Sequence, residues 1–185
     1  MKELLERFHR SGKHISLYHE ADTPDTFSFG TVLCMDDDFV LMQLLSLDGG
    51  YDGIALFSLD EIIRIEVDTQ YAEKMNTLME SARKDSIGWQ PVVDAACMLE
   101  SVLLSIKHME CLTTIDLVSC ADSILGTIDE LGDGWLSVCQ VDDYGHPDGR
   151  CYFRTSDITA LYCNSAAEQR IQQLIDAVKE ISKVD

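Results

Sequence analysis

Basic residues are scarce in this chain of 185 residues, where 14 Lys and Arg stand against 33 Asp and Glu for a formal net charge of −19. Both halves share the acidic excess, and neither contains a basic run. Proteins that bind nucleic acid usually draw much of their affinity from Lys and Arg that neutralise phosphates. The sequence therefore argues against a broad surface that binds nucleic acid and against binding to an anionic membrane. It favours a basic partner.

Long apolar runs are also absent. No stretch approaches the length that spans a bilayer, and the first ten residues include Glu3 and Glu6, which is unlike a signal peptide. The seven cysteines are odd in number and contain no Cys-x-x-Cys. They predict reduced thiols in a cytoplasmic protein.

Catalytic motifs are missing as well. The sequence has no phosphate-binding glycine loop, no His-Glu-x-x-His, no dinucleotide fingerprint and no recognisable nucleophile turn. We therefore expect no enzyme activity and no cofactor. His9, His14 and His19 recur every five residues, which fits neither a helical face nor one side of a strand, so we expect no metal site from them.

What the chain does contain is an internal repeat. Sliding the sequence on itself by 96 positions aligns turn residues with turn residues and apolar residues with apolar residues, without a gap from residue 30 to 79. The aligned pairs include Gly30 with Gly126, Asp37 with Asp133, Gly49 with Gly145, Gly53 with Gly149, Phe57 with Phe153 and Leu78 with Leu174. We expect two copies, residues 1–84 and 92–185, with a linker over 81–90.

Upstream of residue 30 the offset changes. Ser11-x-Lys13-His14 matches Ser105-x-Lys107-His108 at an offset of 94. This match predicts that His14 and His108 are equivalent. It also predicts a two-residue insertion in the first strand or loop of the second copy.

Each copy is predicted to be a helix, five short strands and a second helix. In the first copy the strands are expected over 14–20, 26–35, 39–47, 53–58 and 61–67. Ser165 and Glu168 have the spacing of a capping box at the start of the last helix. Five short antiparallel strands leave exposed edges unless the sheet curls, so a small barrel is the predicted closure. The predicted fold class is mainly β with flanking helices, α+β, as a tandem duplication.

The segment from Gly30 to Val40 resembles the first motif of Sm-like proteins, which is a glycine, five residues, an Asp, two residues and then Met-Asn. The second copy has Gly126 at the glycine, and Trp135 and Leu136 at the last two positions. The resemblance covers about residues 14–67 and 110–163. It implies two five-stranded barrels of the Sm-like or SH3-like type.

The RNA chemistry of the Sm-like family does not carry over to this sequence. Family members stack a base on the residue at the Met position and hydrogen-bond it with the following Asn, but here those pairs are Phe39-Val40 and Trp135-Leu136. Val40 and Leu136 have no polar side-chain atom with which to read a base edge. The family's arginine in the last hairpin falls at Ser58 in one copy and at Arg154 in the other. The candidates for base stacking or partner contact are Phe39, Trp135 and Arg154.

Acidic, glycine-containing turns are the other candidate sites. They are Asp36, Asp37 and Asp38, then Asp48 and Asp52, and in the second copy Asp142, Asp143 and Asp148. Carboxylates beside glycine can ligate Ca²⁺, but the spacing of an EF-hand and its terminal glutamate are absent. Asp and Gly are also what hairpin turns require, so solvated turns are the favoured interpretation.

The sequence thus predicts a non-catalytic, acidic, cytoplasmic module for protein interaction or regulation, with a protein partner of basic character. Two alternatives stay open: an Sm-like RNA-binding protein with a degenerate base pocket, and a metal-dependent protein that uses the Asp-Gly loops. The copies share turns and apolar positions but no polar constellation. Any activity is therefore predicted to belong to one copy or to the groove between the copies.

Overall fold

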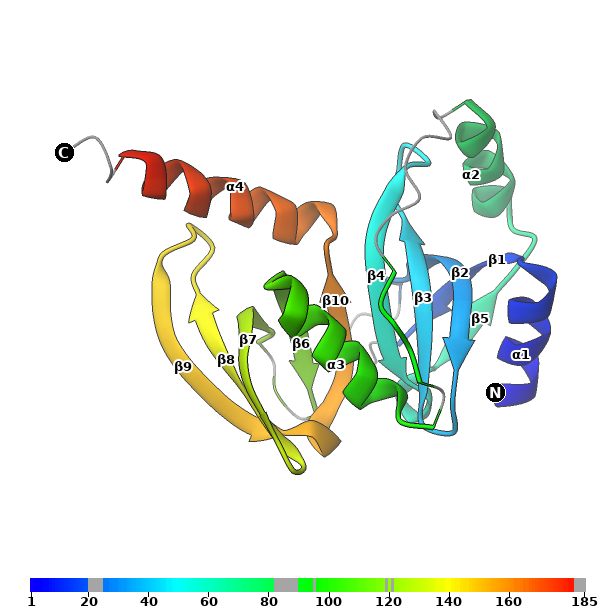
Figure 1. Ribbon diagram of the computed structural model, residues 1–185. Helices are drawn as coiled ribbons and strands as arrows, with labels where there is room; N and C mark the ends of the chain where they lie inside the picture. The colour runs from blue at the N-terminus through cyan, green and yellow to red at the C-terminus, as the bar shows by residue number, and fades with distance from the viewer. Residues whose placement is uncertain (20–24, 82–89, 95, 119, 121, 182–185) are drawn as a thin grey trace. The chain divides into compact units, whose positions relative to one another are not determined.

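The computed structural model describes residues 1–19, 25–81, 90–94, 96–118, 120 and 122–181. These residues form four α-helices and ten β-strands (Figure 1). The chain divides into two compact units, Met1–Ser101 and Val102–Asp185, called unit 1 and unit 2 below. The fold is therefore mainly β with flanking helices, as predicted, whereas the linker predicted over 81–90 lies almost wholly outside the described residues. No helix in the described ranges is both long and apolar enough to cross a membrane.

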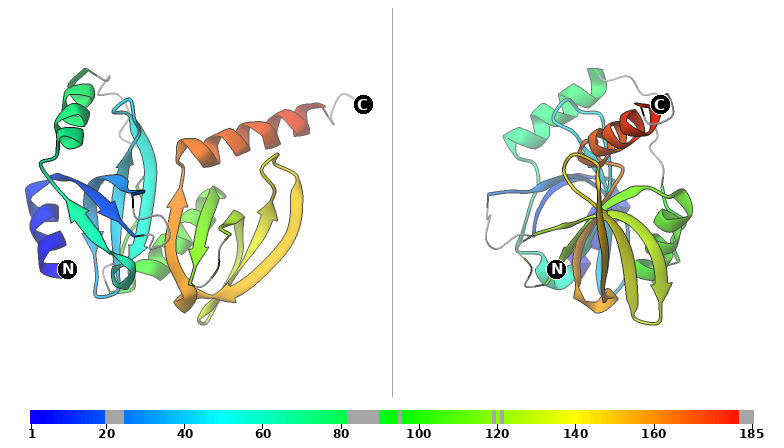
Figure 2. Two further views of the ribbon diagram at one scale, coloured as in Figure 1. Left: turned by 180° about the vertical axis from the view of Figure 1, so that it is seen from behind. Right: turned by 90° about the vertical axis from the view of Figure 1, so that its left-hand side faces the viewer.

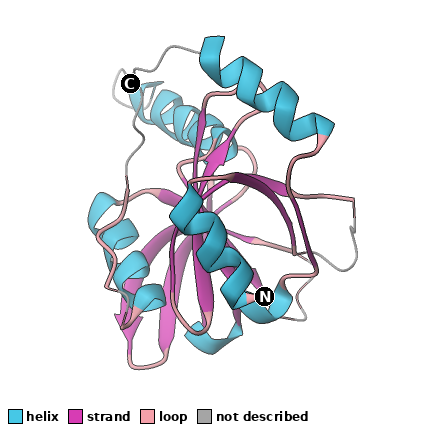
Figure 3. Cartoon of the chain, turned by 90° about the vertical axis from the view of Figure 1, so that its right-hand side faces the viewer, coloured by secondary structure: helices cyan, strands magenta, loops and turns pink. Residues whose placement is uncertain are grey.

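Unit 1 is an antiparallel sheet with a helix before it and a helix after it. Its elements are α1 (Lys2–Ser11), β1 (His14–Tyr18), β2 (Ser28–Met35), β3 (Phe39–Leu45), β4 (Tyr51–Ser58), the 3-10 turn η1 (Leu59–Glu61), β5 (Arg64–Glu66) and α2 (Gln70–Ser81). The strands are ordered β5-β1-β2-β3-β4. Leu5 and Phe8 bury one face of α1, and Gly12, at φ 63°, ends the helix. Figure 3 shows α1, near the label N, lying over the strands of its unit.

Unit 2 has the same order of elements. They are α3 (Met98–Met109), β6 (Leu112–Leu117), β7 (Ile124–Gly132), β8 (Trp135–Val141), β9 (Pro147–Arg154), the 3-10 turn η2 (Thr155–Asp157), β10 (Ile158–Cys163) and α4 (Ala166–Ile181). The boundary between the units falls within α3. The strand order is β10-β6-β7-β8-β9, again antiparallel throughout. Each strand of unit 2 thus has the place in its sheet that its counterpart has in unit 1.

The units also share their irregularities. A β-bulge interrupts the ladder between Val32 and Cys34 in unit 1 and between Ile128 and Glu130 in unit 2. Both bulges fall at the offset of 96 residues found in the sequence. Because a bulge bends its strand and increases the local twist, both sheets curve at the same point.

The C-terminal helix of each unit packs on the turn between the third and fourth strands. Gly49 and Gly145 form these turns with φ of 83° and 80°. A Cβ atom added to Gly49 would lie 2.9 Å from the carbonyl carbon of Leu78 in α2, and one added to Gly145 would lie 2.8 Å from Cγ1 of Ile175 in α4. Figure 2 shows α4 running over the β8–β9 turn. Glycine is required at both turns by its conformation and by the approach of the helix.

The predicted equivalence of His14 and His108 is wrong. His14 lies in β1 opposite Thr31, whereas His108 lies in the last turn of α3. In unit 2 the residue opposite Thr127, the counterpart of Thr31, is Leu112.

The predicted insertion is also wrong. The end of the helix and the first strand are shifted by 98 residues between the units, from Ser11 to Met109 and from His14 to Leu112, whereas the second strands are shifted by 96. Unit 2 is therefore two residues shorter, not longer, between its first two strands.

The predicted closure into barrels is not observed. Among the described residues, the end strands of each unit, β5 with β4 and β10 with β9, are not paired with each other. A 3-10 turn instead links the two end strands along the chain, at Leu59–Glu61 and at Thr155–Asp157. Each unit is therefore a bent, open sheet.

Candidate functional site

The exposed face of β8 and β9 brings together two of the residues singled out from the sequence. Trp135 lies directly opposite Arg154 in the ladder, and Tyr152 lies opposite Ser137 on the same face. The side chains of Trp135 and Tyr152 are 38% and 58% exposed, and their ring centroids are 6.1 Å apart. Arg150 follows on this face, because side chains two residues apart in a strand point the same way. We call Trp135, Arg150, Tyr152 and Arg154 the β8–β9 patch.

The turn before β8 holds the indole of Trp135 in place. A Cβ atom on Gly132 would lie 2.1 Å from the ring of Trp135. The indole therefore lies against the glycine backbone, in space that any side chain at position 132 would take. The Gly132-Asp133-Gly134 turn thus has a second role beyond reversing the chain: it leaves room for a flat, partly exposed aromatic ring.

The two arginines of the patch have different surroundings. Arg150 is held by an ion pair of 3.0 Å with Asp129 and by a 3.8 Å contact with the sulfur of Cys139. Its pKa is raised, first by the hydrogen bond to Tyr152 and then by Cys139 and Asp129. Arg154 has no ion-pair partner among the described residues, so its guanidinium is available to an incoming carboxylate or phosphate.

Unit 1 does not repeat this patch. Phe39, the counterpart of Trp135, is half-buried and lies opposite Ser58. The residues that correspond to Arg150 and Tyr152 are Ile54 and Leu56, and both are buried. Of the three residues proposed for stacking or partner contact, the structure therefore brings Trp135 and Arg154 together in unit 2, whereas Phe39 belongs to unit 1.

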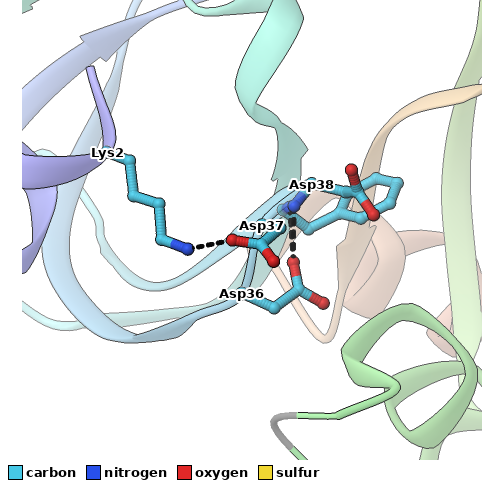
Figure 4. Close-up of polar contacts among 5 residues, drawn as sticks. Lys2, Asp36, Asp37 and Asp38 are labelled. Carbon is cyan, nitrogen blue, oxygen red and sulfur yellow. Dashed lines mark hydrogen bonds and ion pairs between the residues drawn. The ribbon is translucent and has the colours of Figure 1, made fainter.

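The Asp36–Asp38 turn between β2 and β3 is built by its own carboxylates (Figure 4). Asp36 Oδ1 accepts hydrogen bonds from the backbone N–H groups of Asp38, at 2.9 Å, and of Phe39, at 2.7 Å. Asp37 forms an exposed ion pair with Lys2 at the start of α1. The hydrogen bond from Lys2 lowers the pKa of Asp37 and raises that of Lys2. These groups stabilise the turn, as the solvated-turn interpretation predicts.

The β3–β4 turn of unit 1 contains Asp48 and precedes Asp52. Asp48 accepts hydrogen bonds from the hydroxyl of Ser46 and, at 3.2 Å, from the N–H of Gly50, and these bonds lower its pKa. Asp52 lines a cavity of about 390 Å³ at the start of β2 and the end of β3, together with Phe29. This turn and the Asp36–Asp38 turn lie at opposite ends of β3, so the acidic loops of unit 1 do not converge.

The β8–β9 turn of unit 2 contains Asp142 and Asp143, and Asp148 follows as the second residue of β9. Asp142 accepts hydrogen bonds from the backbone N–H groups of Tyr144, at 2.9 Å, and His146, at 2.8 Å, and its Oδ2 lies 3.2 Å from Nδ1 of His146. The N–H of His146 is the main cause of the lowered pKa of Asp142. Asp143 and Asp148 are exposed. Across the part of the chain that the structure describes, no group of three His, Cys, Asp or Glu is placed to hold a metal ion.

Sequence reasoning missed Tyr152 and Arg150, which complete the patch. A signal for them exists in the sequence: Arg150, Tyr152 and Arg154 alternate along one predicted strand, as outward-facing residues of a strand do. Their position beside Trp135 depends on the pairing register, which the β8–β9 turn and its bulge determine.

Comparisons with known proteins give no identity. No family model matches the sequence, and no curated protein is significantly similar to it. A solved structure of YcgR in complex with c-di-GMP from Escherichia coli covers 98% of this chain and 90% of that chain, at 8% sequence identity and a TM-score of 0.19. A TM-score this low is no evidence of a common fold, so neither the fold nor the ligand of YcgR bears on this chain.

Proposed function

We propose that the chain is a tandem duplication of an Sm-like unit that serves as a non-catalytic protein-interaction module. The common element order, the bulges 96 residues apart and the equivalent Gly49 and Gly145 turns support the duplication. The segment from Gly30 to Asp36, which begins in β2 and leads into the turn before β3, supports the assignment to the Sm-like type. The free state of all seven cysteines supports a reducing compartment such as the cytoplasm.

The β8–β9 patch is the observation that carries the interaction function. Tyr, Trp and Arg are the residues most enriched among those that dominate binding energy at protein interfaces. Here they gather on one exposed strand pair of a chain whose net charge is −19. The partner therefore contributes an acidic side chain to Arg154 and apolar or aromatic groups to the rings of Trp135 and Tyr152. This differs from the basic partner that net charge alone favours.

The same patch also suits RNA, since an aromatic ring and an arginine can hold a base and a phosphate. Two features favour a protein. Leu136 and Val40, at the positions where Sm-like proteins read a base, are buried in the sheets and have no polar side-chain atom. The net charge of −19 opposes a phosphate backbone, which carries a charge at every nucleotide.

Photocrosslinking from the patch tests the proposal. The photoreactive residue p-benzoylphenylalanine replaces Tyr152, and in a matched control it replaces Tyr144, which is 71% exposed in the β8–β9 turn but outside the patch. In cells of the source organism we expect a discrete crosslinked protein from position 152 and none from position 144. Equal crosslinking from both positions, or a product that ribonuclease removes, would contradict the proposal.

A further inference from the structure

Cys111 and Cys163 lie next to each other at one edge of unit 2. Cys163 is the last residue of β10 and lies opposite Thr113 in β6. Cys111 comes two residues before Thr113, so its side chain is on the same face of the sheet as that of Cys163. The two thiols interact with each other, and this interaction shifts their pKa values in opposite directions.

The two thiols differ in accessibility. Cys163 is fully buried, with 0% of its surface exposed. Cys111 is half-buried and lines a cavity of about 220 Å³ together with Glu110 and Glu168. The S–H of Cys111 donates to the carbonyl of Met109 at 3.7 Å, which leaves its sulfur free to accept from Cys163. A small reagent can therefore reach Cys111 first, with Cys163 held behind it.

The corresponding corner of unit 1 is joined by different chemistry. Lys13 precedes β1 as Cys111 precedes β6, and Asp68 follows β5 as Asn164 follows β10. Lys13 and Asp68 form an ion pair of 2.5 Å, and Asp68 and Asn164 have φ of 56° and 61°. The start of the first strand is thus linked to Asp68 by an ion pair in unit 1, whereas in unit 2 its counterpart Cys111 interacts with Cys163, the residue before Asn164.

We propose that Cys111 and Cys163 form a reversible redox site that a hydroperoxide oxidises to a disulfide. The Cys111 thiolate attacks the peroxide, its O–O bond breaks, and Cys111 becomes a sulfenic acid as water or an alcohol leaves with a proton. The Cys163 sulfur then displaces hydroxide from Cys111, which leaves as water with the proton of Cys163, and an S–S bond forms. A small thiol or dithiol reductant reverses the reaction by thiol–disulfide exchange.

The protonation of Cys111 suits its role as the attacking group. The hydrogen bond from Cys163 lowers the pKa of Cys111 to about 7, although partial burial raises it. The same hydrogen bond and burial raise the pKa of Cys163, as does the charge of Glu168. At neutral pH Cys111 therefore carries a larger thiolate fraction than an ordinary thiol, which is ionised to only a few per cent.

Cys97 provides a matched control in the same chain. It is more exposed than Cys111, but slight desolvation and the nearby Asp94 raise its pKa. The lower pKa of Cys111 gives it the larger thiolate fraction at pH 7, which outweighs the weaker nucleophilicity of a low-pKa thiolate. Cys111 should therefore react with iodoacetamide several-fold faster than Cys97 at pH 7, and its pH midpoint should lie below that of Cys97.

The experiment follows the full-length protein after treatment with stoichiometric hydrogen peroxide, by peptide mass spectrometry without reductant. We expect a Cys111–Cys163 disulfide that dithiothreitol removes. In the Cys163→Ser variant we expect a sulfenic acid at Cys111 that dimedone traps, and in Cys111→Ser we expect Cys163 to stay reduced. If Cys163→Ser does not fold, the wild-type peptide map and the alkylation profile of Cys111 still decide the proposal.

Other outcomes overturn the proposal. These are a wild-type map without the Cys111–Cys163 linkage, oxidation of Cys97 at the same rate as Cys111, or an alkylation midpoint for Cys111 that matches that of Cys97. None of these measurements depends on the β8–β9 patch, so the redox site and the proposed interaction function stand or fall separately.

Discussion

At the scale of single residues, the acidic turns are best understood as backbone structures. Asp36, Asp48 and Asp142 each accept hydrogen bonds from backbone N–H groups two or more residues ahead, as in Asx turns. Such a carboxylate stabilises a hairpin turn locally. The acidic residues therefore contribute first to the fold, although they also give the surface its charge.

Neighbouring residues in one turn provide a test of this interpretation. Asp36→Ala removes the acceptor of two backbone N–H groups and should lower the free energy of unfolding by about 1 kcal/mol. Asp37→Ala removes only an exposed ion pair with Lys2, so its effect should be small and should vanish at high salt. Urea unfolding of both variants at low and high salt measures the difference. An effect of Asp37→Ala equal to that of Asp36→Ala would contradict this account.

Residue type predicts some of these roles and not others. Gly49, Gly145 and the turn aspartates are predicted correctly because their conformational and hydrogen-bonding properties are local. Tyr152 and Cys111 are not singled out, since their importance depends on which residue lies across the ladder or behind them in the sheet. That information belongs to the tertiary structure.

At the scale of elements, α4 is anchored by a capping box that reaches into the sheet. Glu168 is only 3% exposed, and its carboxylate accepts from the backbone N–H of Ser165 at 2.7 Å and from the hydroxyl of Thr114 in β6 at 2.6 Å. The capping box predicted from the sequence is therefore confirmed. Its contact with β6 shows that the box also docks the helix.

Replacing Glu168 should loosen this docking. Glu168→Ala leaves the Thr114 hydroxyl and the Ser165 N–H without their acceptor, at a cost of about 2–3 kcal/mol in the free energy of unfolding. Asp176→Ala, on the exposed side of the same helix, should change it by less than about 0.5 kcal/mol. Thermal and urea unfolding followed by circular dichroism compare the two. Equal stabilities for the two variants would show that α4 is not held by Glu168.

Strand boundaries show where sequence patterns lose information. The last strand of the first copy is predicted over 61–67 from its alternating apolar residues, but β5 spans only Arg64–Glu66. After β4 the chain first makes the 3-10 turn η1 before it enters β5. Ile63, just before β5, has an exposed side chain, and its backbone N–H donates to the carbonyl of Tyr18. Alternation identifies the strand, whereas its start depends on how the chain crosses the end of the sheet.

At the scale of the whole molecule, two units with the same order of elements have different surfaces. The positions that hold Tyr152 and Arg150 in unit 2 hold Leu56 and Ile54 in unit 1. The offset of 96 residues predicts the common scaffold from the sequence, whereas this difference requires the pairing of β8 with β9. Our central claim is therefore that unit 2, and not unit 1, makes the functional contact.

The most direct test compares equivalent positions in the two units. Arg154→Ala in unit 2 and Ser58→Ala in unit 1 change equivalent residues, each at the end of the fourth strand of its unit. Titration calorimetry then measures the affinity of each variant for the partner that is crosslinked through position 152. Loss of a central arginine should weaken binding at least tenfold, or about 1.4 kcal/mol, while Ser58→Ala should leave it unchanged. Equal losses, or no loss for Arg154→Ala, would contradict the claim.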